Sequence, residues 1–215
     1  YTAFSTFTLV EKNKLIGEPM KSLITTLLLL VITLSSTAFG DDFSDAIAAY
    51  DKGDYKTAMK LWKPMAEKGD VGAQYNLGFM YNNGEGVPED DKQAVKWYRL
   101  AAEQGNASAQ GSLGVMYANG HGVPEDDKQA GKWFRLAAEQ GNASAQGSLG
   151  VMYGNGYGVP EDKVLAYMWW NLAAASGSEN ASKNKDIIVK SMTSFQIAEA
   201  QKLSRECLKK NYNNC

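Results

Sequence analysis

One pattern of apolar and polar positions occurs three times between residues 71 and 178. The tryptophans of the three copies, Trp97, Trp133 and Trp169, recur at intervals of 36 residues. Within each copy, apolar residues follow one another three and four positions apart, a spacing that places them on one face of an α-helix. A fixed period of this length is typical of a solenoid, in which each repeat buries its apolar face against its neighbours.

Each copy is predicted to form two helices joined by a loop. In the first copy, the first helix covers residues 73–82 and the second covers residues 91–104. Between them lies the segment Gly84-Glu85-Gly86-Val87-Pro88. Because glycine permits backbone angles that other residues avoid and proline cannot continue a helix, this segment is predicted to be a loop.

Local signals mark the start of the second helix and the packing of the first. Asp90 is followed three residues later by Gln93, which predicts a capping box. The third copy has Leu165 at the glutamine position, so its capping box is expected to be lost. Gly78 lies in the middle of the first helix, where glycine is less favourable than alanine by about 1 kcal/mol. Since the other copies keep this glycine, we expect the backbone of a neighbouring helix to approach it closely.

The order of these residues resembles the pattern of the Sel1-like repeat family. That pattern is an alanine, a Leu-Gly pair, a tyrosine, a Gly-x-Gly-Val-Pro loop followed by an acidic residue, an alanine, a Trp-aromatic pair, Ala-Ala and a closing glycine. The resemblance covers the whole of residues 71–178. The first copy meets the pattern with Ala73, Leu77-Gly78, Tyr81, Gly84-Glu85-Gly86-Val87-Pro88, Asp90, Ala94, Trp97-Tyr98, Ala101-Ala102 and Gly105.

The resemblance implies an all-α fold, an α/α solenoid of helix-turn-helix repeats similar to tetratricopeptide repeats. Family members commonly act as adaptors between proteins, so we expect a module that binds another protein or peptide in its concave surface, with no enzymatic activity and no cofactor. The alternative is an envelope enzyme or glycan binder, because a cysteine-rich bacterial branch of the family has been linked to penicillin binding and β-lactam hydrolysis. That branch has disulfides within its repeats, whereas the repeats of this chain contain no cysteine.

The first 40 residues carry a different signal. Met20 and a lysine precede an apolar run, which ends in small residues up to Gly40. This order is typical of a secretory signal peptide, predicted over residues 20–40 with cleavage after Ala38 or after Gly40. A membrane anchor is the alternative, but the run is short for a span of about 20 residues. Residues 1–19 would then be upstream sequence outside the natural protein, and the mature protein would be periplasmic or secreted, with no membrane span.

The segments on either side of the three copies are predicted to close the solenoid. Residues 41–70 resemble a shorter, degenerate first repeat without the Gly-Val-Pro loop, and Pro64 should kink or shorten its second helix. The complete repeats are then 71–106, 107–142 and 143–178. The third is the most apolar, and residues 179–215 are expected to cover it as a C-terminal capping helix or pair of helices. The covering side chains are expected to be Ile187, Ile188, Met192, Ile197, Ala200, Leu203 and Leu208.

Two cysteines, Cys207 and Cys215, lie near the end of the chain. Neither belongs to a Cys-x-x-Cys motif or accompanies a histidine pair, so their spacing does not indicate a metal site. In an exported protein an even number of cysteines favours a disulfide, which we predict here; the alternative is two free thiols in a frayed tail.

Composition and charge argue against nucleic-acid binding and against catalysis. The chain carries 22 Lys and Arg against 24 Asp and Glu, a formal net charge of −2. A nucleic-acid partner would need a basic face to neutralise its phosphates. The one histidine, His121, occupies a loop position held by Glu85 and Tyr157 in the other copies, so it is interpreted as a variable loop tip. We therefore expect no catalytic, cofactor or metal site.

Differences between the copies indicate where a partner could bind. The first two copies differ at nine positions, seven of them in the first helix or the loop. In related superhelical repeats the first helices line the concave surface, although neutral drift after duplication would give the same pattern. By contrast, Trp133 is retained at every equivalent site and should be buried. The candidate groove residues are Tyr75, Asn76, Phe79, Asn82, Val115 and Val151.

Overall fold

The computed structural model describes residues 42–212 and residue 215, and in this part of the chain all regular elements are helices. The predicted upstream residues 1–19 and the predicted signal peptide 20–40 lie outside the described residues. Residues 42–51 are helical. The helices that follow are α3 (Tyr55–Glu67), α4 (Val71–Asn83), α5 (Asp91–Glu103), α6 (Ala107–Asn119), α7 (Asp127–Ala138), α8 (Ala143–Asn155), α9 (Lys163–Ala175), α10 (Glu179–Ile188), the 3-10 turn η1 (Val189–Ser191) and α11 (Ser194–Lys209).

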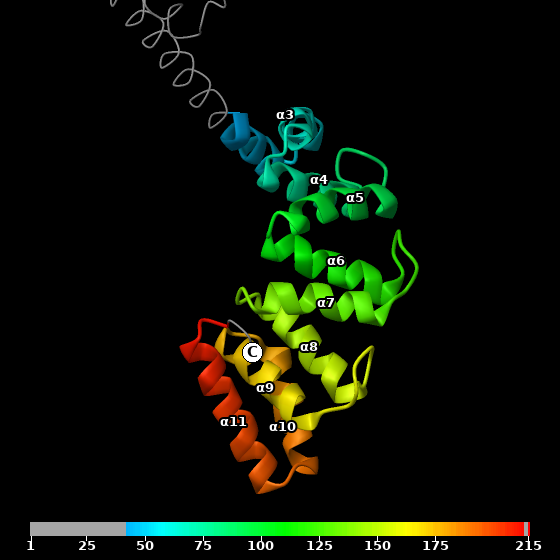
Figure 1. Cartoon of the computed structure of the whole chain (residues 1–215). Helices are drawn as coiled ribbons and strands as arrows, with labels where there is room; N and C mark the ends of the chain where they lie inside the picture. The colour runs from blue at the N-terminus through cyan, green and yellow to red at the C-terminus, as the bar shows by residue number, and fades with distance from the viewer. Residues whose placement is uncertain (1–41, 213–214) are drawn as a thin grey trace, which may run out of the picture.

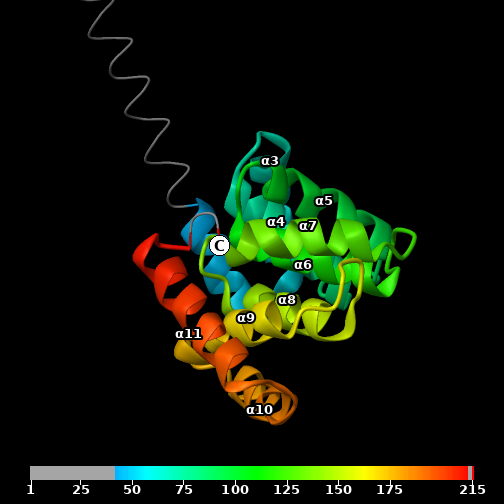
Figure 2. The same ribbon diagram turned by 60° about the horizontal axis from the view of Figure 1, so that its bottom comes forward.

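The helices stack in chain order. Each repeat is an antiparallel pair, α4 with α5, α6 with α7 and α8 with α9, and each pair also packs against the next. Figure 1 shows the described helices following one another along an arc, and Figure 2 shows the same stack turned toward the viewer. The predicted all-α solenoid of helix-turn-helix repeats is therefore confirmed.

Carboxylate caps begin the second helix of every repeat. The side chains of Asp90 and Asp126 accept hydrogen bonds from backbone N–H groups three residues later. In the third repeat Asp162 accepts from both Val164 and Leu165, so the aspartate half of the motif persists where the glutamine is absent. The third copy thus lacks a capping box with glutamine, as expected, but keeps its N-cap, because an N-cap needs only the acceptor oxygen.

The degenerate first repeat keeps a full-length second helix. Helix α3 has 13 residues, as many as α5, and continues through Pro64 to Glu67. The predicted shortening at Pro64 is therefore wrong. Pro64 removes one backbone hydrogen bond, to the carbonyl of Lys60, and both residues are exposed, so water can hydrate that carbonyl.

An aromatic ring from the second helix lies over a glycine of the first helix in every repeat. A Cβ atom built on Gly78 would lie 2.6 Å from the nearest ring carbon of Tyr98, and one on Gly114 would lie 2.6 Å from Phe134. The expectation that the backbone of a neighbouring helix approaches this glycine is therefore wrong. An aromatic side chain approaches it instead, and the glycine leaves room for the ring. The glycine–ring pairs are Gly78 with Tyr98, Gly114 with Phe134 and Gly150 with Trp170.

The second glycine of each Gly-x-Gly loop joins neighbouring repeats. Gly86 has a φ of +74° and its loop lies against the backbone of Tyr55 in the preceding repeat, 2.9 Å from a built Cβ. Positive φ and this lack of space both require glycine. The corresponding contacts in the later repeats are Gly122 with Asp91 and Gly158 with Asp127.

Glutamines also connect successive repeats. Gln74 in α4 donates to the carbonyl of Ala66 at 3.1 Å, and Gln104 donates to Gln74 Oε1 at 2.7 Å. The next repeat has the same two bonds through Gln110 and Gln140. In the last repeat Ser176 replaces the second glutamine, and the buried Oε1 of the remaining glutamine, Gln146, has no hydrogen-bond partner among the described residues.

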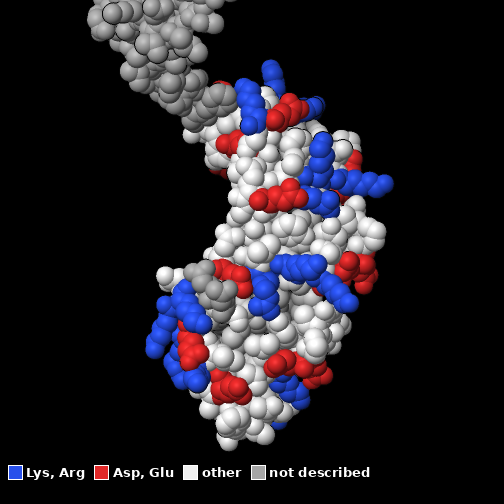
Figure 3. Space-filling model, in the orientation of Figure 1, with Lys and Arg blue, Asp and Glu red and all other residues white. Residues whose placement is uncertain are grey.

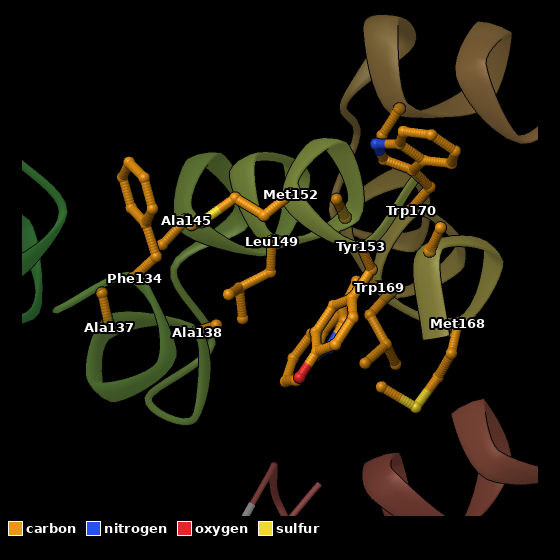
Figure 4. Close-up of a cluster of buried hydrophobic side chains, with 14 of the residues drawn as sticks. Phe134, Ala137, Ala138, Ala145, Leu149, Met152, Tyr153, Met168, Trp169 and Trp170 are labelled. Carbon is orange, nitrogen blue, oxygen red and sulfur yellow. The ribbon is translucent and has the colours of Figure 1, made fainter. Parts of the chain in front are cut away.

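The tryptophans of the repeats differ in burial. Trp169 is 0 % exposed in a core that includes Ala181 and Cys207 of the C-terminal helices, and Figure 4 shows this core around α8 and α9. Trp97 is also buried, whereas Trp133 is only partly buried at the margin of the core of the first two repeats. The prediction that Trp133 is buried is thus wrong, because its ring packs only against the margin of that core.

The C-terminal helices cover the third repeat. Leu172 is completely buried, although Leu100 and Leu136 at the same repeat position are 38 % and 46 % exposed. Ala200 is buried in this contact, as expected. Two further covering residues were predicted wrongly, because Ile187 is 63 % and Leu208 is 42 % exposed. Helix α11 begins with a capping box between Thr193 and Gln196.

A disulfide closes the C-terminal turn. Cys207 and Cys215 are bonded, with their Cα atoms 5.2 Å apart. Within this loop Tyr212 donates its backbone N–H to the carbonyl of Cys207 at 3.0 Å, and its ring lies against Gly141, 3.2 Å from a built Cβ. The loop therefore places an aromatic side chain over the junction between the second and third repeats.

We predict that Gly114→Ala lowers the free energy of unfolding by about 1–3 kcal/mol, because the added methyl collides with the Phe134 ring. Gly147→Ala is the matched control, since it also lies within a first helix but a Cβ there meets nothing within 4 Å. The control should stabilise the protein by about 0.5–1 kcal/mol through helix propensity. Urea denaturation of both variants checks the prediction, and equal effects of the same sign would contradict it.

We predict that Trp169→Ala lowers the free energy of unfolding by about 3–5 kcal/mol, the usual range for a large buried aromatic residue. Trp133→Ala should lower it less, because part of that ring is already in water. Denaturation midpoints of the two variants measure the difference. A larger loss of unfolding free energy for Trp133→Ala than for Trp169→Ala would contradict the prediction, because stability would then not follow the burial of the ring.

We predict that dithiothreitol lowers the melting temperature of the native protein but not that of a Cys207→Ala/Cys215→Ala variant. The closed loop is short, so the loss in free energy should be at most about 3 kcal/mol. Mass spectrometry of peptides from protein purified without reductant should find the two cysteines linked. Two free thiols in that material would rule out the disulfide.

Candidate partner-binding groove

The first helices present one outward-facing apolar residue at the same position in each repeat. Phe79 of α4, Val115 of α6 and Val151 of α8 are 37 %, 44 % and 37 % exposed. Their neighbours one and two positions before them, such as Leu77 and Gly78, are buried against the second helix. Because two positions along an α-helix correspond to a rotation of about 200°, burying Leu77 leaves Phe79 in the open. We call the surface that carries these three residues the first-helix face.

An aromatic cavity lies at the N-terminal end of the first-helix face. It has a volume of about 340 Å³ and brings rings of the degenerate repeat next to rings of α4. The Tyr50 and Trp62 ring centroids are 5.7 Å apart. No charged side chain lines this cavity. Its walls are Ile47, Tyr50, Trp62, Tyr75, Asn76 and Phe79.

Hydrogen bonding and burial keep the tyrosines here neutral. The Tyr50 hydroxyl donates to a Glu85 carboxylate oxygen at 2.6 Å. Burial, together with this bond and the nearby carboxylate charge, raises the pKa of Tyr50 well above its ordinary value. Burial also raises the pKa of Tyr75. Both hydroxyls therefore remain protonated over the physiological pH range.

A central cavity continues from the aromatic cavity. Its volume is about 290 Å³, and Tyr75 belongs to the walls of both. Hydroxyl and amide groups dominate its walls, which carry no charged side chain. The walls are Tyr75, Ser108, Gly111, Ser112, Val115, Phe134, Asn142, Ser144, Ala145 and Ser148.

An acidic cavity follows, between the second and third repeats. It has a volume of about 530 Å³ and shares Val115, Phe134 and Ser148 with the central cavity. Glu125 and Asp127 line it, and no lysine or arginine among the described residues does. Its walls are Val115, Ala118, Asn119, Glu125, Asp127, Phe134, Ser148, Val151, Met152 and Tyr157.

A lysine cavity lies beyond it, between the third repeat and the C-terminal helices. It has a volume of about 420 Å³ and shares Val151 with the acidic cavity. Lys163 is its one charged wall residue. The walls are Val151, Gly154, Asn155, Lys163, Trp170, Asn184, Ile187, Ile188 and Ser191.

Five of the six candidates from the sequence lie on the walls of these cavities. Tyr75, Asn76 and Phe79 belong to the aromatic cavity, and Val115 and Val151 to the acidic cavity. The exception is Asn82, at the end of α4, whose side-chain amide donates to Asn83 Oδ1 at 3.2 Å outside the four cavities. Their role in binding remains a prediction.

Sequence reasoning missed the charged and aromatic walls. Glu125, Asp127 and Lys163 were not singled out as site residues. A signal did exist, because position 127 of the second repeat is aspartate and the same position of the third repeat, 163, is lysine. The aromatic Tyr50 and Trp62 could not be placed, since they come from the irregular first repeat.

The charged side chains are unevenly distributed over the molecule. Figure 3 shows lysines, arginines and carboxylates around a mostly uncharged hollow beside the left-hand end of α6. Within residues 42–212 and 215, no three His, Cys, Asp or Glu side chains gather as metal ligands would. The same residues contain no helix with the length and hydropathy of a membrane span. His121 lies exposed at its loop tip.

The repeats match a known protein family. The family model described as Sel1 repeat matches residues 49–70, 71–106, 107–142 and 143–178. These segments together make up more than half of the chain. A search of curated protein sequences finds no significant match.

Solved structures with the same repeats resemble this chain. One is a protective antigen present in uropathogenic Escherichia coli strains, described as displaying an SLR fold. Its sequence is 32 % identical and its TM-score is 0.74. The match covers 83 % of this chain and 40 % of the antigen. A Sel1 repeat protein from Oxalobacter formigenes has 33 % identity and a TM-score of 0.65 over 67 % of this chain and 59 % of the other. The chain thus spans less than two thirds of the length of either protein.

Proposed function

This chain belongs to the Sel1 repeat family, whose repeats typically mediate protein–protein interaction, and we propose that it binds an extended segment of another protein along its first-helix face. The family fold typically serves as a non-catalytic scaffold, and the proposed function accordingly involves no cofactor. The protein would then act as an adaptor that holds its partner in the groove formed by the four cavities.

One observation carries the proposal: the four cavities are neighbours, and each shares a wall residue with the next. Tyr75 joins the aromatic cavity to the central cavity, Val115 joins the central cavity to the acidic cavity, and Val151 joins the acidic cavity to the lysine cavity. A small molecule would need one enclosed pocket, whereas a row of open pockets suits the successive side chains of a polypeptide.

The walls suit a polypeptide in composition as well. Large half-exposed aromatic rings such as Phe79 are the usual energetic anchors of protein interfaces, because they bury much apolar surface and lose little side-chain entropy. Serine and asparagine side chains in the central cavity offer hydrogen bonds to the main chain of a bound segment. The first helices hold these groups on a rigid frame.

We also propose that the protein works outside the cytoplasm, in the periplasm or after secretion. The signal-peptide pattern of residues 20–40 and the bonded cysteine pair at the chain end support this location.

We expect that peptides selected on the native protein from a random phage-displayed library bind more weakly to Phe79→Ala by about tenfold or more, which corresponds to about 1.4 kcal/mol. Isothermal titration calorimetry with the synthetic peptides measures the change. Leu100→Ala is the matched control, because Leu100 is 38 % exposed and Phe79 is 37 % exposed, but Leu100 lies on the second helix of the repeat.

The control variant should bind the peptides as the native protein does. A similar loss in both variants would place the binding surface elsewhere. A selection that enriches no peptide at all would contradict the proposal.

A further inference from the structure

We propose, on the basis of the proposed peptide groove, that the bound segment carries a lysine or arginine side chain in the acidic cavity and a nearby aspartate or glutamate side chain in the lysine cavity. The groove would then recognise a charge pair in a fixed order, and the order would set the direction in which the segment lies. The partner is thus a protein with an exposed segment that combines apolar residues with one basic and one acidic residue.

The two charged cavities are built from the same repeat positions. Phe134 and Trp170 form corresponding walls, as do Val115 and Val151. The repeat position that holds Asp127 in the acidic cavity holds Lys163 in the lysine cavity. The acidic cavity and the lysine cavity occupy equivalent places in adjacent repeats but carry opposite charges. They should therefore bind side chains of opposite charge.

The acidic cavity has the shape that a long basic side chain needs. Val115 stands where the first repeat has Phe79, so the smaller side chain leaves open space above Phe134. The apolar walls would cover the aliphatic stem of a lysine or arginine, while the carboxylates of Glu125 and Asp127 face the charged end.

The position of the Asp127 backbone is fixed by the fold. The backbone of Asp127 touches Gly158 of the next repeat, and a Cβ on that glycine would lie 2.6 Å from the Asp127 carbonyl carbon. Asp127 is also the first residue of α7. The contact between repeats therefore fixes the backbone that carries this carboxylate before any partner binds, which reduces the entropy lost on binding.

None of the three charged residues of the two cavities, Glu125, Asp127 and Lys163, forms an ion pair within the described part of the chain. The ion pairs recorded there join Arg135 to Glu139 and Lys202 to Glu206, and include no residue of the two cavities. Coulomb attraction to an incoming opposite charge is therefore not offset by the breaking of an internal pair.

The lysine cavity offers a matching environment for a carboxylate. Lys163 is its only charged wall residue, and Asn184 and Ser191 supply polar side chains beside it. The indole N–H of Trp170 is already bound to the Gly147 carbonyl at 3.1 Å, so it does not compete for the ligand. Since Val151 lies on the walls of both cavities, the basic and acidic side chains of the segment must be close in sequence.

The test is selection of random phage-displayed peptides on the native protein and on charge variants. On the native protein, we expect enriched peptides to share a Lys or Arg and an Asp or Glu at one fixed spacing. Selection on Asp127→Asn should lose the basic residue. Selection on Lys163→Glu should replace the acidic residue with a second basic residue.

The chain supplies close controls for both variants. Asp91→Asn changes the same helix position one repeat earlier, and Lys128→Met removes an exposed lysine outside the cavities. Both should enrich the native consensus. Synthetic consensus peptides should bind Asp127→Asn at least about tenfold more weakly than Asp91→Asn.

Two results would separate this inference from the proposed function. Peptides that bind in the groove and depend on Phe79 but show no shared charge pair would overturn the inference and leave the proposed function standing. A charge pair whose enrichment is unchanged in Asp127→Asn and Lys163→Glu would also overturn it, because the charges would then be read elsewhere.

Discussion

The contact between an aromatic ring and a glycine inside each repeat is the interaction on which the rest of the structure depends. The ring of Phe134 lies so close to Gly114 that even a methyl group has no room between them. This contact sets the distance between the two helices of the repeat and buries one face of the first helix. As a consequence, the opposite face of that helix, with Val115, is left open to a partner.

Contacts between repeats use residues that do not vary, whereas the cavity walls use residues that do. The loop glycines that touch the preceding repeat are retained in successive copies, and so are the glutamine side chains that donate to a carbonyl of the preceding repeat, Gln74, Gln110 and Gln146. Val115 in place of Phe79 and Lys163 in place of Asp127 change the cavities without touching these contacts. The solenoid can therefore alter its binding surface one position at a time while its stacking energy stays the same.

Features that depend on neighbouring residues in the chain could be predicted from the sequence, and features that depend on distant neighbours could not. The helix pairs, the loops and the aspartate caps follow from local periodicity and turn chemistry, and all are present. The partner of Gly78 is Tyr98, 20 positions later, and the burial of Trp169 depends on helices near the end of the chain. The acidic and lysine cavities could not be predicted because their walls come from several helices that only the fold brings together.

The central claim is that the partner lies on the first-helix face, and site-specific photo-crosslinking tests it directly. A photoreactive amino acid replaces Val115 in one protein and Leu136 in another, two aliphatic positions that are 44 % and 46 % exposed but lie on the first and second helices of the same repeat. A library-selected peptide should become linked to the protein labelled at position 115 and not to the one labelled at position 136. Linkage at position 136 alone, or equally at both, would contradict the claim.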